Sequence, residues 1–287
     1  MSFDIYTAVT DRIIQQLEKG VIPWEKPWTG VQGGAYSGVT GKPYSLLNQM
    51  LLRSPGAYFT YNEVTKRGGH VRKGEKSSMI VFWKQLTLTS DKDKDTHMEE
   101  DTDGQEEKKA FVLRYYNVFH IDQCDGLTVE APQTATDRPT SPAADNVITD
   151  YTSRENLTLR HQKGDEAYYS PSRDCVVLPL MEQFTDLAEY YSTAFHELTH
   201  STGHATRLNR LTATAHFGNT EYSKEELTAE IGAAALMNYT GTETAKAFRN
   251  SAAYIQNWLT ALRNDRRMIV YASGAAAKAV DYILAGA

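Results

Sequence analysis

The stretch TAFHELTHSTGH, residues 193–204, places three histidines and one glutamate within nine positions. Its centre, HELTH, fits the pattern H-E-x-x-H with His196, Glu197 and His200. Residues four apart on a helix lie one turn apart on the same face, so both imidazoles can bind one metal ion. Glu197 points about 100° around the helix from His196, where it can reach a metal-bound water without being a ligand. Because the metal lowers the pKa of that water, the pattern predicts Glu197 as the general base.

The sequence around this motif is typical of an amphipathic helix over about residues 183–202. An apolar stripe is formed at helical spacing by Leu187, Tyr191, Ala194 and Leu198. The two histidines fall roughly opposite that stripe, so one face can pack on the core while the other faces a cleft. Histidines with a purely structural role would be expected within the stripe. The pattern therefore favours a metal site.

A catalytic zinc site needs a third protein ligand and an open coordination position. Thr206 stands where the longer pattern H-E-x-x-H-x-x-G-x-x-H requires histidine, and Gly203 is expected to end the helix before His204. The segment SKEELTAEIGAAAL offers Glu226 and Glu230, one turn apart on a second predicted helix. We assign Glu226 as the metal ligand and Glu230 as the carboxylate that holds a ligand histidine in place. The reverse assignment satisfies the same spacing.

The second predicted helix also has the composition for close packing. Gly232 and Ala233–Ala235 are small, which would let it approach the H-E-x-x-H helix closely. Glu221 and Glu225 are interpreted as a solvated acidic start of this helix. For two histidines and one glutamate we expect Zn²⁺, with another divalent metal as the alternative.

A strand, CVVLP, precedes the metal helix at residues 175–179. In a zinc-dependent peptidase such a strand can lie along the cleft and pair with an extended peptide by edge addition. That would give Val176 to Leu178 a role in substrate binding. An ordinary core strand explains the same residues equally well.

Composition and length describe a globular protein without membrane spans. The chain has 287 residues, 41% of them hydrophobic and 23% charged, and no apolar run approaches the roughly 20 residues that cross a bilayer. The first 20 residues carry acids where a signal peptide has a basic region and an apolar region. Two cysteines, Cys124 and Cys175, are too few for a secreted disulfide scaffold. We therefore expect a cytoplasmic protein without a membrane partner.

The net charge of −6 conceals a basic N-terminal region. Residues 1–85 contain 11 Lys and Arg against 6 Asp and Glu, whereas residues 86–110 contain 4 against 9. Basic residues beside glycines suit contact with phosphates, and nearby aromatics suit stacking on single-stranded bases. The candidate DNA-binding residues are Trp24, Trp28, Lys66, Arg67, Arg72, Lys73, Lys76 and Tyr115. A solvated turn beside core aromatics is the competing interpretation.

The pattern of elements predicts an α+β fold in two domains. Residues 1–127 are expected to form an α+β domain with a small antiparallel sheet, and residues 128–146 a linker rich in Pro and Thr. Residues 147–287 are expected to form a mostly helical domain with a small sheet. The predicted helices cover about 4–19, 45–52, 60–69, 183–202, 223–239, 244–264 and 268–285, and the predicted strands 77–88, 110–121 and a strand pair within 165–179.

A polar, acidic segment at 87–109 separates the two N-terminal strands. It is too polar to bury a core of its own, so we expect a long hairpin loop. Mimicry of DNA charge, or guarding of a DNA groove, is a less economical explanation.

Four stretches of the first half resemble the N-terminal domain of the ArdC antirestriction proteins, which is also found in conjugative plasmid primases of the TraC type. They are DRIIQQLEKGVIPWEKPW, PYSLLNQMLL, GGHVRKGEKSSMIVFWK and YYNVFHIDQCDGL. YYSTAFHELTHSTGHATRLNR, followed by EELTAEIGAAAL, resembles the zincin-like metallopeptidase domain of the same proteins. The family's metal motif falls here on His196, Glu197 and His200, with its acidic ligand in EELTAE.

This resemblance implies a plasmid-encoded cytoplasmic protein that binds single-stranded DNA with little sequence preference. It would protect incoming conjugative DNA from host restriction. Two alternatives remain. One is a metalloprotease that cleaves a host protein and uses its first half to recruit it. The other is a non-catalytic interaction protein in which the metal only braces the fold.

Overall fold

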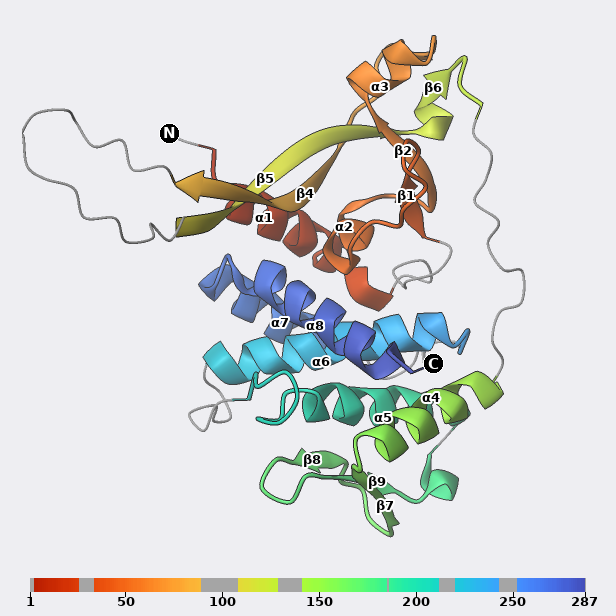
Figure 1. The fold of residues 1–287 in the computed structure, drawn as a ribbon, viewed down its shortest axis with the longest axis vertical. Helices are drawn as coiled ribbons and strands as arrows, with labels where there is room; N and C mark the ends of the chain where they lie inside the picture. Colours follow the sequence, from red (N-terminus) through yellow and green to blue (C-terminus); the bar gives the residue numbers. More distant parts are fainter. Residues whose placement is uncertain are drawn as a thin grey trace, which may run out of the picture.

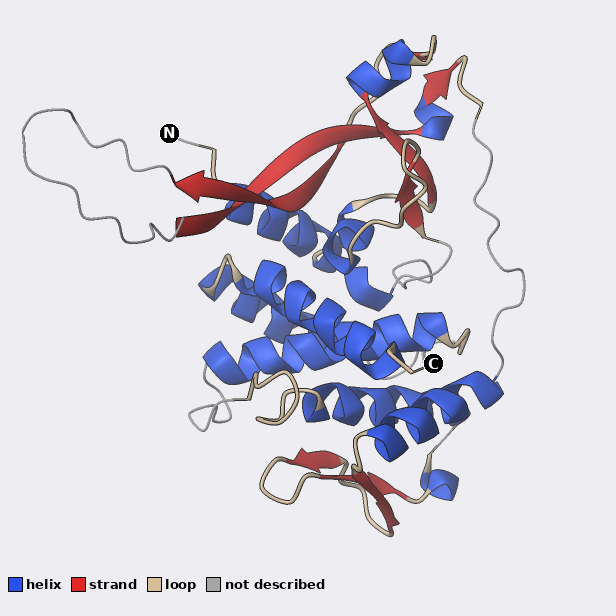
Figure 2. Cartoon of the chain, viewed as in Figure 1, coloured by secondary structure: helices blue, strands red, loops and turns tan. Residues whose placement is uncertain are grey.

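The computed structural model describes residues 3–25, 34–88, 108–128, 141–184, 186–211, 220–242 and 252–286. Its elements are arranged in layers, with a sheet at each end and helices between them (Figures 1 and 2). This is the α+β architecture predicted from the sequence. The chain builds one end of the stack first, crosses to the other end, and finishes with helices in the middle.

The N-terminal sheet is dominated by a long antiparallel ribbon. The four strands, in the order in which they pair, are β1 (Ala35–Ser37), β2 (Gly56–Thr60), β5 (Lys108–His120) and β4 (Ser78–Leu88). β4 and β5 pair without interruption from Ser78 opposite Val118 to Leu88 opposite Lys108, as the β-branched and aromatic residues predict. The short strand β1 runs parallel to β2, a pairing that the sequence did not reveal.

Three helices, two 3₁₀ turns and a pair of two-residue strands complete the described part of the N-terminal half. They are α1 (Ile5–Leu17), the 3₁₀ turns η1 (Pro23–Glu25) and η2 (Ile121–Gln123), α2 (Leu46–Leu51), α3 (Tyr61–Lys66), and the strands β3 (His70–Val71) and β6 (Cys124–Asp125). α1 buries Val9, Ile13 and Leu17, as the spacing predicts. Thr60 caps α3 by accepting a hydrogen bond from the amide of Glu63 at 3.3 Å.

The C-terminal half is mostly helical. Its elements are α4 (Ser141–Arg154), β7 (Thr158–Gln162), β8 (Tyr168–Ser170), β9 (Cys175–Pro179), η3 (Met181–Gln183), α5 (Leu187–Ser201), α6 (Thr220–Tyr239), α7 (Ala252–Asn264) and α8 (Met268–Leu284). α4 begins at Ser141, so the last residues of the predicted linker 128–146 are helical. No helix in the described ranges is long and apolar enough to cross a membrane.

The strand that precedes the metal helix is the central strand of its sheet. β9 pairs in parallel with β7 on one side and antiparallel with β8 on the other. Both of its edges are occupied, and Val176 and Leu178 are fully buried. The prediction that Val176 to Leu178 could receive a peptide by edge addition is therefore wrong, and the core-strand interpretation is confirmed.

One hydrophobic cluster runs through both halves of the chain. It joins Ile13 and Trp24 of the N-terminal half to Leu198, Leu236 and Ile283 of the C-terminal half. α1 and α2 lie between the N-terminal sheet and the helices α6 to α8 (Figure 1). The N-terminal sheet is thus packed through α1 and α2 onto the helices of the C-terminal half.

Candidate metal centre

α5 presents His196 and His200 on one face. The helix begins after Asp186, whose side chain accepts a hydrogen bond from the amide of Glu189 at 2.8 Å. The Nε2 atoms of the two histidines lie 3.1 Å apart, as expected for residues one turn apart. Of the predicted apolar stripe, Tyr191, Ala194 and Leu198 are buried, whereas Leu187 is half exposed.

α6 brings Glu226 to the two histidines. One carboxylate oxygen of Glu226 lies 3.5 Å from His196 Nε2, and the other lies 3.5 Å from His200 Nε2. A tetrahedral ion with ligand distances of about 2.0–2.1 Å holds its donor atoms roughly 3.3–3.4 Å apart. The three donors therefore already have the spacing of a metal site, and their nitrogen and carboxylate chemistry suits zinc or a similar divalent ion.

Glu197 follows the first histidine and is 8% exposed. Its charge contributes to the raised pKa values of both His196 and Tyr222, which places its carboxylate in the same electrostatic environment as the donors. A divalent ion bound by the two histidines and Glu226 would supply Lewis acidity, which polarises a carbonyl and acidifies water. Glu197 is the buried carboxylate next to that position, as a general base requires.

The carboxylates around His196 favour its protonated form when no metal is present. Burial lowers its pKa, but the hydrogen bond with Glu226 and the charges of Glu230 and Glu197 outweigh burial and raise the pKa to about 9. For Glu226, burial raises the pKa, and the hydrogen bond with His196 together with the charge of His200 lowers it further than burial raises it. A metal ion must therefore displace a proton from the site as it binds.

Glu225 contacts one of the two histidines, which its position in the sequence did not predict. Its carboxylate accepts a hydrogen bond from His200 Nδ1 at 2.9 Å, which leaves Nε2 of that ring available as a metal ligand. Arg210 binds both oxygens of the same carboxylate, at 2.7 and 2.9 Å. The expectation of a solvated Glu225 is wrong, because Arg210, from the chain after α5, covers it. Burial raises the pKa of Glu225, but the bonds to His200 and Arg210 outweigh burial and lower it.

Glu230 and Tyr222 lie on either side of Glu226 on α6. Glu230 Oε1 is 4.0 Å from His196 Nδ1, which is longer than a hydrogen bond, so its predicted role in holding a ligand histidine stays a prediction. Tyr222 was not predicted. It forms a hydrogen bond with Glu226, and burial together with the charge of Glu226 raises its pKa to about 12. The spacing of four residues between Tyr222 and Glu226 is the signal that could have identified it.

The two metal-site helices approach each other at a glycine. A Cβ atom added to Gly232 would lie 2.6 Å from Thr199 Cγ2, closer than side chains pack. The prediction that small residues let these helices approach closely is confirmed at this position. His204 lies after the helix, with Nδ1 2.8 Å from the hydroxyl of Thr206, and it does not join the cluster of donor atoms.

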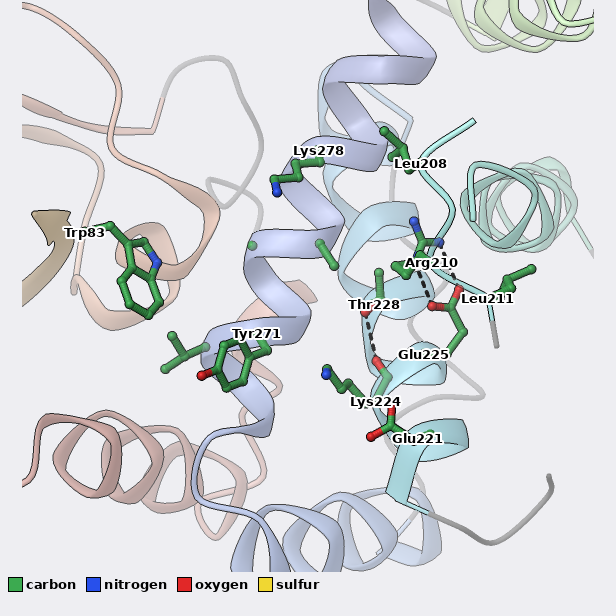
Figure 3. Close-up of a pocket in the computed structure, with 13 residues that line it drawn as sticks. Trp83, Leu208, Arg210, Leu211, Glu221, Lys224, Glu225, Thr228, Tyr271 and Lys278 are labelled. Atoms are coloured by element: carbon green, nitrogen blue, oxygen red, sulfur yellow. Dashed lines mark hydrogen bonds and ion pairs between the residues drawn. The ribbon is translucent and has the colours of Figure 1, made fainter. Parts of the chain in front are cut away.

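A cavity of about 680 Å³ lies beside the metal centre (Figure 3). Arg210 and Glu225 form one wall, Tyr271 and Lys278 of α8 form another, and Trp83 of the ribbon β4 closes the side toward the N-terminal half. The cavity therefore lies between the two halves of the chain and shares Glu225 with the metal site.

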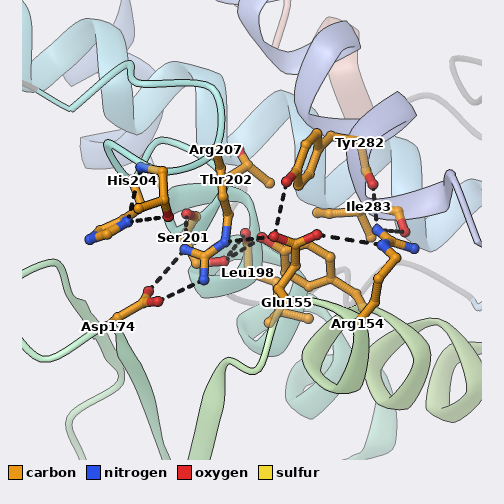
Figure 4. A network of polar contacts seen from close by, with 12 residues as sticks. Arg154, Glu155, Asp174, Leu198, Ser201, Thr202, His204, Arg207, Tyr282 and Ile283 are labelled. Atoms are coloured by element: carbon orange, nitrogen blue, oxygen red, sulfur yellow. Dashed lines mark hydrogen bonds and ion pairs between the residues drawn. The ribbon is translucent and has the colours of Figure 1, made fainter.

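A second arginine fixes the chain that follows α5 (Figure 4). The side chain of Arg207 is 2% exposed and donates to both carboxylate oxygens of Asp174, at 2.9 and 2.8 Å, and to Glu155 at 3.2 Å. Glu155 in turn accepts a hydrogen bond from the hydroxyl of Tyr282 at 2.9 Å. This network joins the end of α4, the β8–β9 hairpin and the end of α8 to the carbonyl of Ser201, the last residue of α5.

Those predicted DNA-binding residues that the structure describes do not form one surface. Lys66, Arg67, Arg72, Lys73 and Lys76 are exposed around α3 and β3. Arg72 forms ion pairs with Glu75 and Asp125, both at 3.5 Å, and Arg67 lies over the ring of Phe59. Figure 1 places α3 at one end of the N-terminal sheet and the free end of β4–β5 at the other.

The aromatic candidates lie elsewhere. Tyr115 is 41% exposed and lies on β5, away from α3. Trp24 is 1% exposed and packs edge-on against Trp258 at 6.1 Å between ring centroids. A buried ring cannot stack on a base, so the prediction for Trp24 is wrong. Trp28 lies outside the described residues.

Comparison with known proteins gives a match to each half of the chain. Residues 3–119 match the N-terminal domain of anti-restriction factor ArdC, and residues 144–275 match a zincin-like metallopeptidase. The crystal structures of the antirestriction ArdC protein from plasmid R388 are similar throughout. The metal-free structure has a TM-score of 0.71 at 35% identity, and the Mn(II)-bound structure 0.72 at 34%. Each comparison covers 98% of this chain and 97% of the other.

Curated relatives extend the comparison. Two proteins named DNA primase TraC, from Escherichia coli, are each 34% identical to 98% of this chain, which spans only 20% and 27% of their length. The uncharacterised protein y4eC of Sinorhizobium fredii is 31% identical, and the match covers 98% of this chain and 91% of that protein. The chain thus spans a fifth to about a quarter of the length of the two TraC primases that it matches.

Proposed function

Because the chain belongs to the ArdC family of antirestriction proteins, we propose that it binds single-stranded DNA through its N-terminal half and hydrolyses a protein with a zinc site in its C-terminal half. The observation that carries the enzymatic part is the convergence of donor atoms of His196, His200 and Glu226 within 4.8 Å of one another beside the buried Glu197. A metal that only braced a fold would need no base beside it. We assign the protein to the cytoplasm of a cell that receives plasmid DNA, where it would protect that DNA from restriction.

The residues around the site have distinct roles in this proposal. Glu197 takes a proton from the attacking water and returns it to the leaving amine. Tyr222, whose pKa of about 12 keeps its hydroxyl protonated at neutral pH, donates its hydrogen bond to Glu226 and so helps to hold that carboxylate in place. Glu225 keeps the His200 imidazole in the orientation that exposes Nε2.

The enzymatic part is tested with Glu197→Gln. This change keeps the volume of the side chain but removes the base. The variant should therefore still bind one zinc ion per chain, while its rate of proteolysis falls at least 100-fold. Zinc content and cleavage of casein, together with cleavage of the chain itself, are the measurements. Glu221→Gln, a carboxylate on the exposed start of α6, is the matched control and should keep full activity. Equal rates for wild type and Glu197→Gln would contradict the proposal, and the absence of cleavage by any metal-loaded form would favour a bracing role.

The DNA-binding part is tested on the whole chain with a fluorescent oligothymidine of about 20 nucleotides. Affinity should fall steeply with salt, since phosphate contacts release counterions, and it should persist after the metal is removed with a chelator. If no oligonucleotide binds at low salt, the first half instead recruits a protein, and the alternative of a plain metalloprotease is favoured.

A further inference from the structure

The outer face of the β4–β5 ribbon combines stacked aromatic rings with cations. The register pairs Phe82 with Arg114, Ile80 with Tyr116 and Lys84 with Val112, so Phe82, Lys84, Arg114 and Tyr116 point to the same side of the ribbon. The rings of Phe82 and Tyr116 are stacked, with centroids 4.9 Å apart and planes at 12°. Tyr116 is 55% exposed, and Lys84 and Arg114 are exposed as well.

The other face of the ribbon is already occupied at its base. Val81 and Leu113 point to that side and are buried in the main core, against which α1 and α2 also pack. Trp83 and Tyr115 are exposed on that same face, whereas on the outer face Ile80 and Val118 are buried and the exposed part begins at Phe82 and Tyr116. Among the side chains of the outer face that the structure describes, Lys84 and Arg114 carry positive charge and none carries negative charge.

From this arrangement we propose that the outer face of β4–β5 is where the protein holds single-stranded DNA, with bases stacked on Phe82 and Tyr116 and phosphates bound by Lys84 and Arg114. The inference rests on the proposed DNA binding and gives it a location different from the basic cluster around α3. A ring pair of which Tyr116 is exposed and Phe82 half-buried can offer a stacking surface to bases of any sequence. Neighbouring cations match the charge of the backbone, and the planar guanidinium of Arg114 suits a phosphate.

The alternative partners differ in what they require. Duplex DNA keeps its bases paired and cannot stack them on Tyr116. An acidic peptide would use Lys84 and Arg114 but would not depend on the rings. Loss of affinity when either ring is removed would therefore distinguish single-stranded DNA from duplex DNA and from an acidic peptide.

Tyr116→Ala and Phe82→Ala should each weaken binding of the oligothymidine by roughly 5- to 150-fold, the range measured for loss of one base–aromatic stack. Tyr116→Phe keeps the ring and should bind like wild type. Tyr115→Ala is the matched control, because this location of the DNA strand excludes Tyr115, which the sequence had suggested: its ring lies on the opposite face, against Phe3 at 5.0 Å. It should stay within about twofold of wild type, and thermal unfolding of every variant checks that the ribbon is intact.

The charges are tested by the salt dependence of binding. Replacing Lys84 and Arg114 together by glutamine should reduce the slope of log affinity against log salt by about 1.4, since each phosphate contact on a single strand contributes about 0.7. The matched double variant of Lys66 and Arg67 on α3 should leave the slope unchanged.

Three results would overturn the inference while wild type still binds the oligothymidine. Tyr116→Ala and Phe82→Ala could bind like wild type, the α3 variant could lose the salt slope instead, or an abasic strand of equal length could bind as tightly as oligothymidine. A wild-type protein that binds no oligonucleotide would contradict the proposed function itself.

Discussion

Glu225 shapes the metal centre without being a ligand. Arg210 donates two hydrogen bonds to its carboxylate, which also accepts a hydrogen bond from His200 Nδ1. A carboxylate in this position fixes both the tautomer and the ring plane of a ligand histidine. Arg210 also donates to the carbonyl of Thr199 at 2.8 Å, so the same side chain ties Glu225 to α5.

We therefore expect Glu225→Gln to weaken zinc binding by about 10- to 100-fold, because the neutral side chain holds both His200 and Arg210 less firmly. Competition with a chromophoric chelator at neutral pH measures the affinity. Glu221→Gln, one turn earlier on α6, should bind zinc like wild type. Unchanged affinity in Glu225→Gln would mean that His200 is oriented by packing alone.

Spacing identified the donors but not the residues that hold them. The four-residue periods of His196 with His200 and of Glu226 with Glu230 are visible in the sequence. Glu225 falls outside that period, and its burial depends on Arg210, which reaches it from another segment. The prediction for Trp24 was wrong for a different reason. The polar sequence around this residue is the same whether its ring is buried or exposed, so it does not show that the ring lies in the core.

The helix pair α5–α6 depends on a residue without a side chain. Gly232 faces Thr199, one residue before His200, and the α6 backbone can approach only because no Cβ intervenes. The distance between these helices sets the distance between Glu226 and the two histidines. Packing at Gly232 thus affects the geometry of the metal site.

Gly232→Ala should destabilise the protein by roughly 1–3 kcal/mol, because overpacking outweighs the gain of about 1 kcal/mol that alanine brings to a helix. It should also weaken zinc binding. Gly274→Ala in α8 is the control, since nothing lies within 4 Å of its added Cβ, and it should be neutral or stabilising. Urea unfolding of both variants checks the prediction, and a neutral Gly232→Ala would show that α6 can shift at no cost.

Elements with a clear periodic pattern or turn signal were predicted, including the short helices α2 and α3, whereas the longer α4 was missed because it begins inside the stretch rich in Pro and Thr. α1, α5, α8 and the β4–β5 ribbon extend over enough residues for helical or strand periodicity to appear. β8 was predicted as the first strand of the pair within 165–179, whereas β1, β2 and β7 were not predicted, because each has three to five residues and its place depends on pairing with another segment. The position of β9 between β7 and β8 follows from that pairing, so its role as a central strand could not be predicted from CVVLP alone.

The C-terminal half is joined by a buried arginine that links segments far apart in the chain. Arg207 connects Asp174 of the hairpin to Glu155 after α4, and Glu155 connects to Tyr282 of α8. Burial raises the pKa of Asp174, but the hydrogen bonds from Arg207 and Tyr169 outweigh burial and lower it. The ionised carboxylate is therefore the form that stabilises the fold.

Because the folded-state pKa is lowered, this stabilisation is complete above the ordinary value of 3.8 and disappears as the pH falls through the lower folded value. Asp174→Asn should destabilise the protein by roughly 1–3 kcal/mol at pH 7, less than a fully buried pair, because Asp174 is 33% exposed. The difference from wild type should shrink as the pH falls from about 4 to 2. Asp150→Asn, which breaks an exposed pair with Arg154, should change stability by less than about 0.5 kcal/mol at any pH. A difference that does not depend on pH would assign the effect to packing.

The cavity in Figure 3 has a thermodynamic consequence because Glu225 belongs both to its wall and to the hydrogen bond of His200. Binding free energies around a closed cycle must sum to zero. If a molecule in the cavity changes the affinity of the site for metal by some factor, the metal changes the affinity for that molecule by the same factor. Trp83 of the N-terminal ribbon also borders the cavity, so a molecule bound there would contact both halves of the chain and couple them to the metal site. Metal titrations with and without a cavity ligand would measure the coupling factor directly.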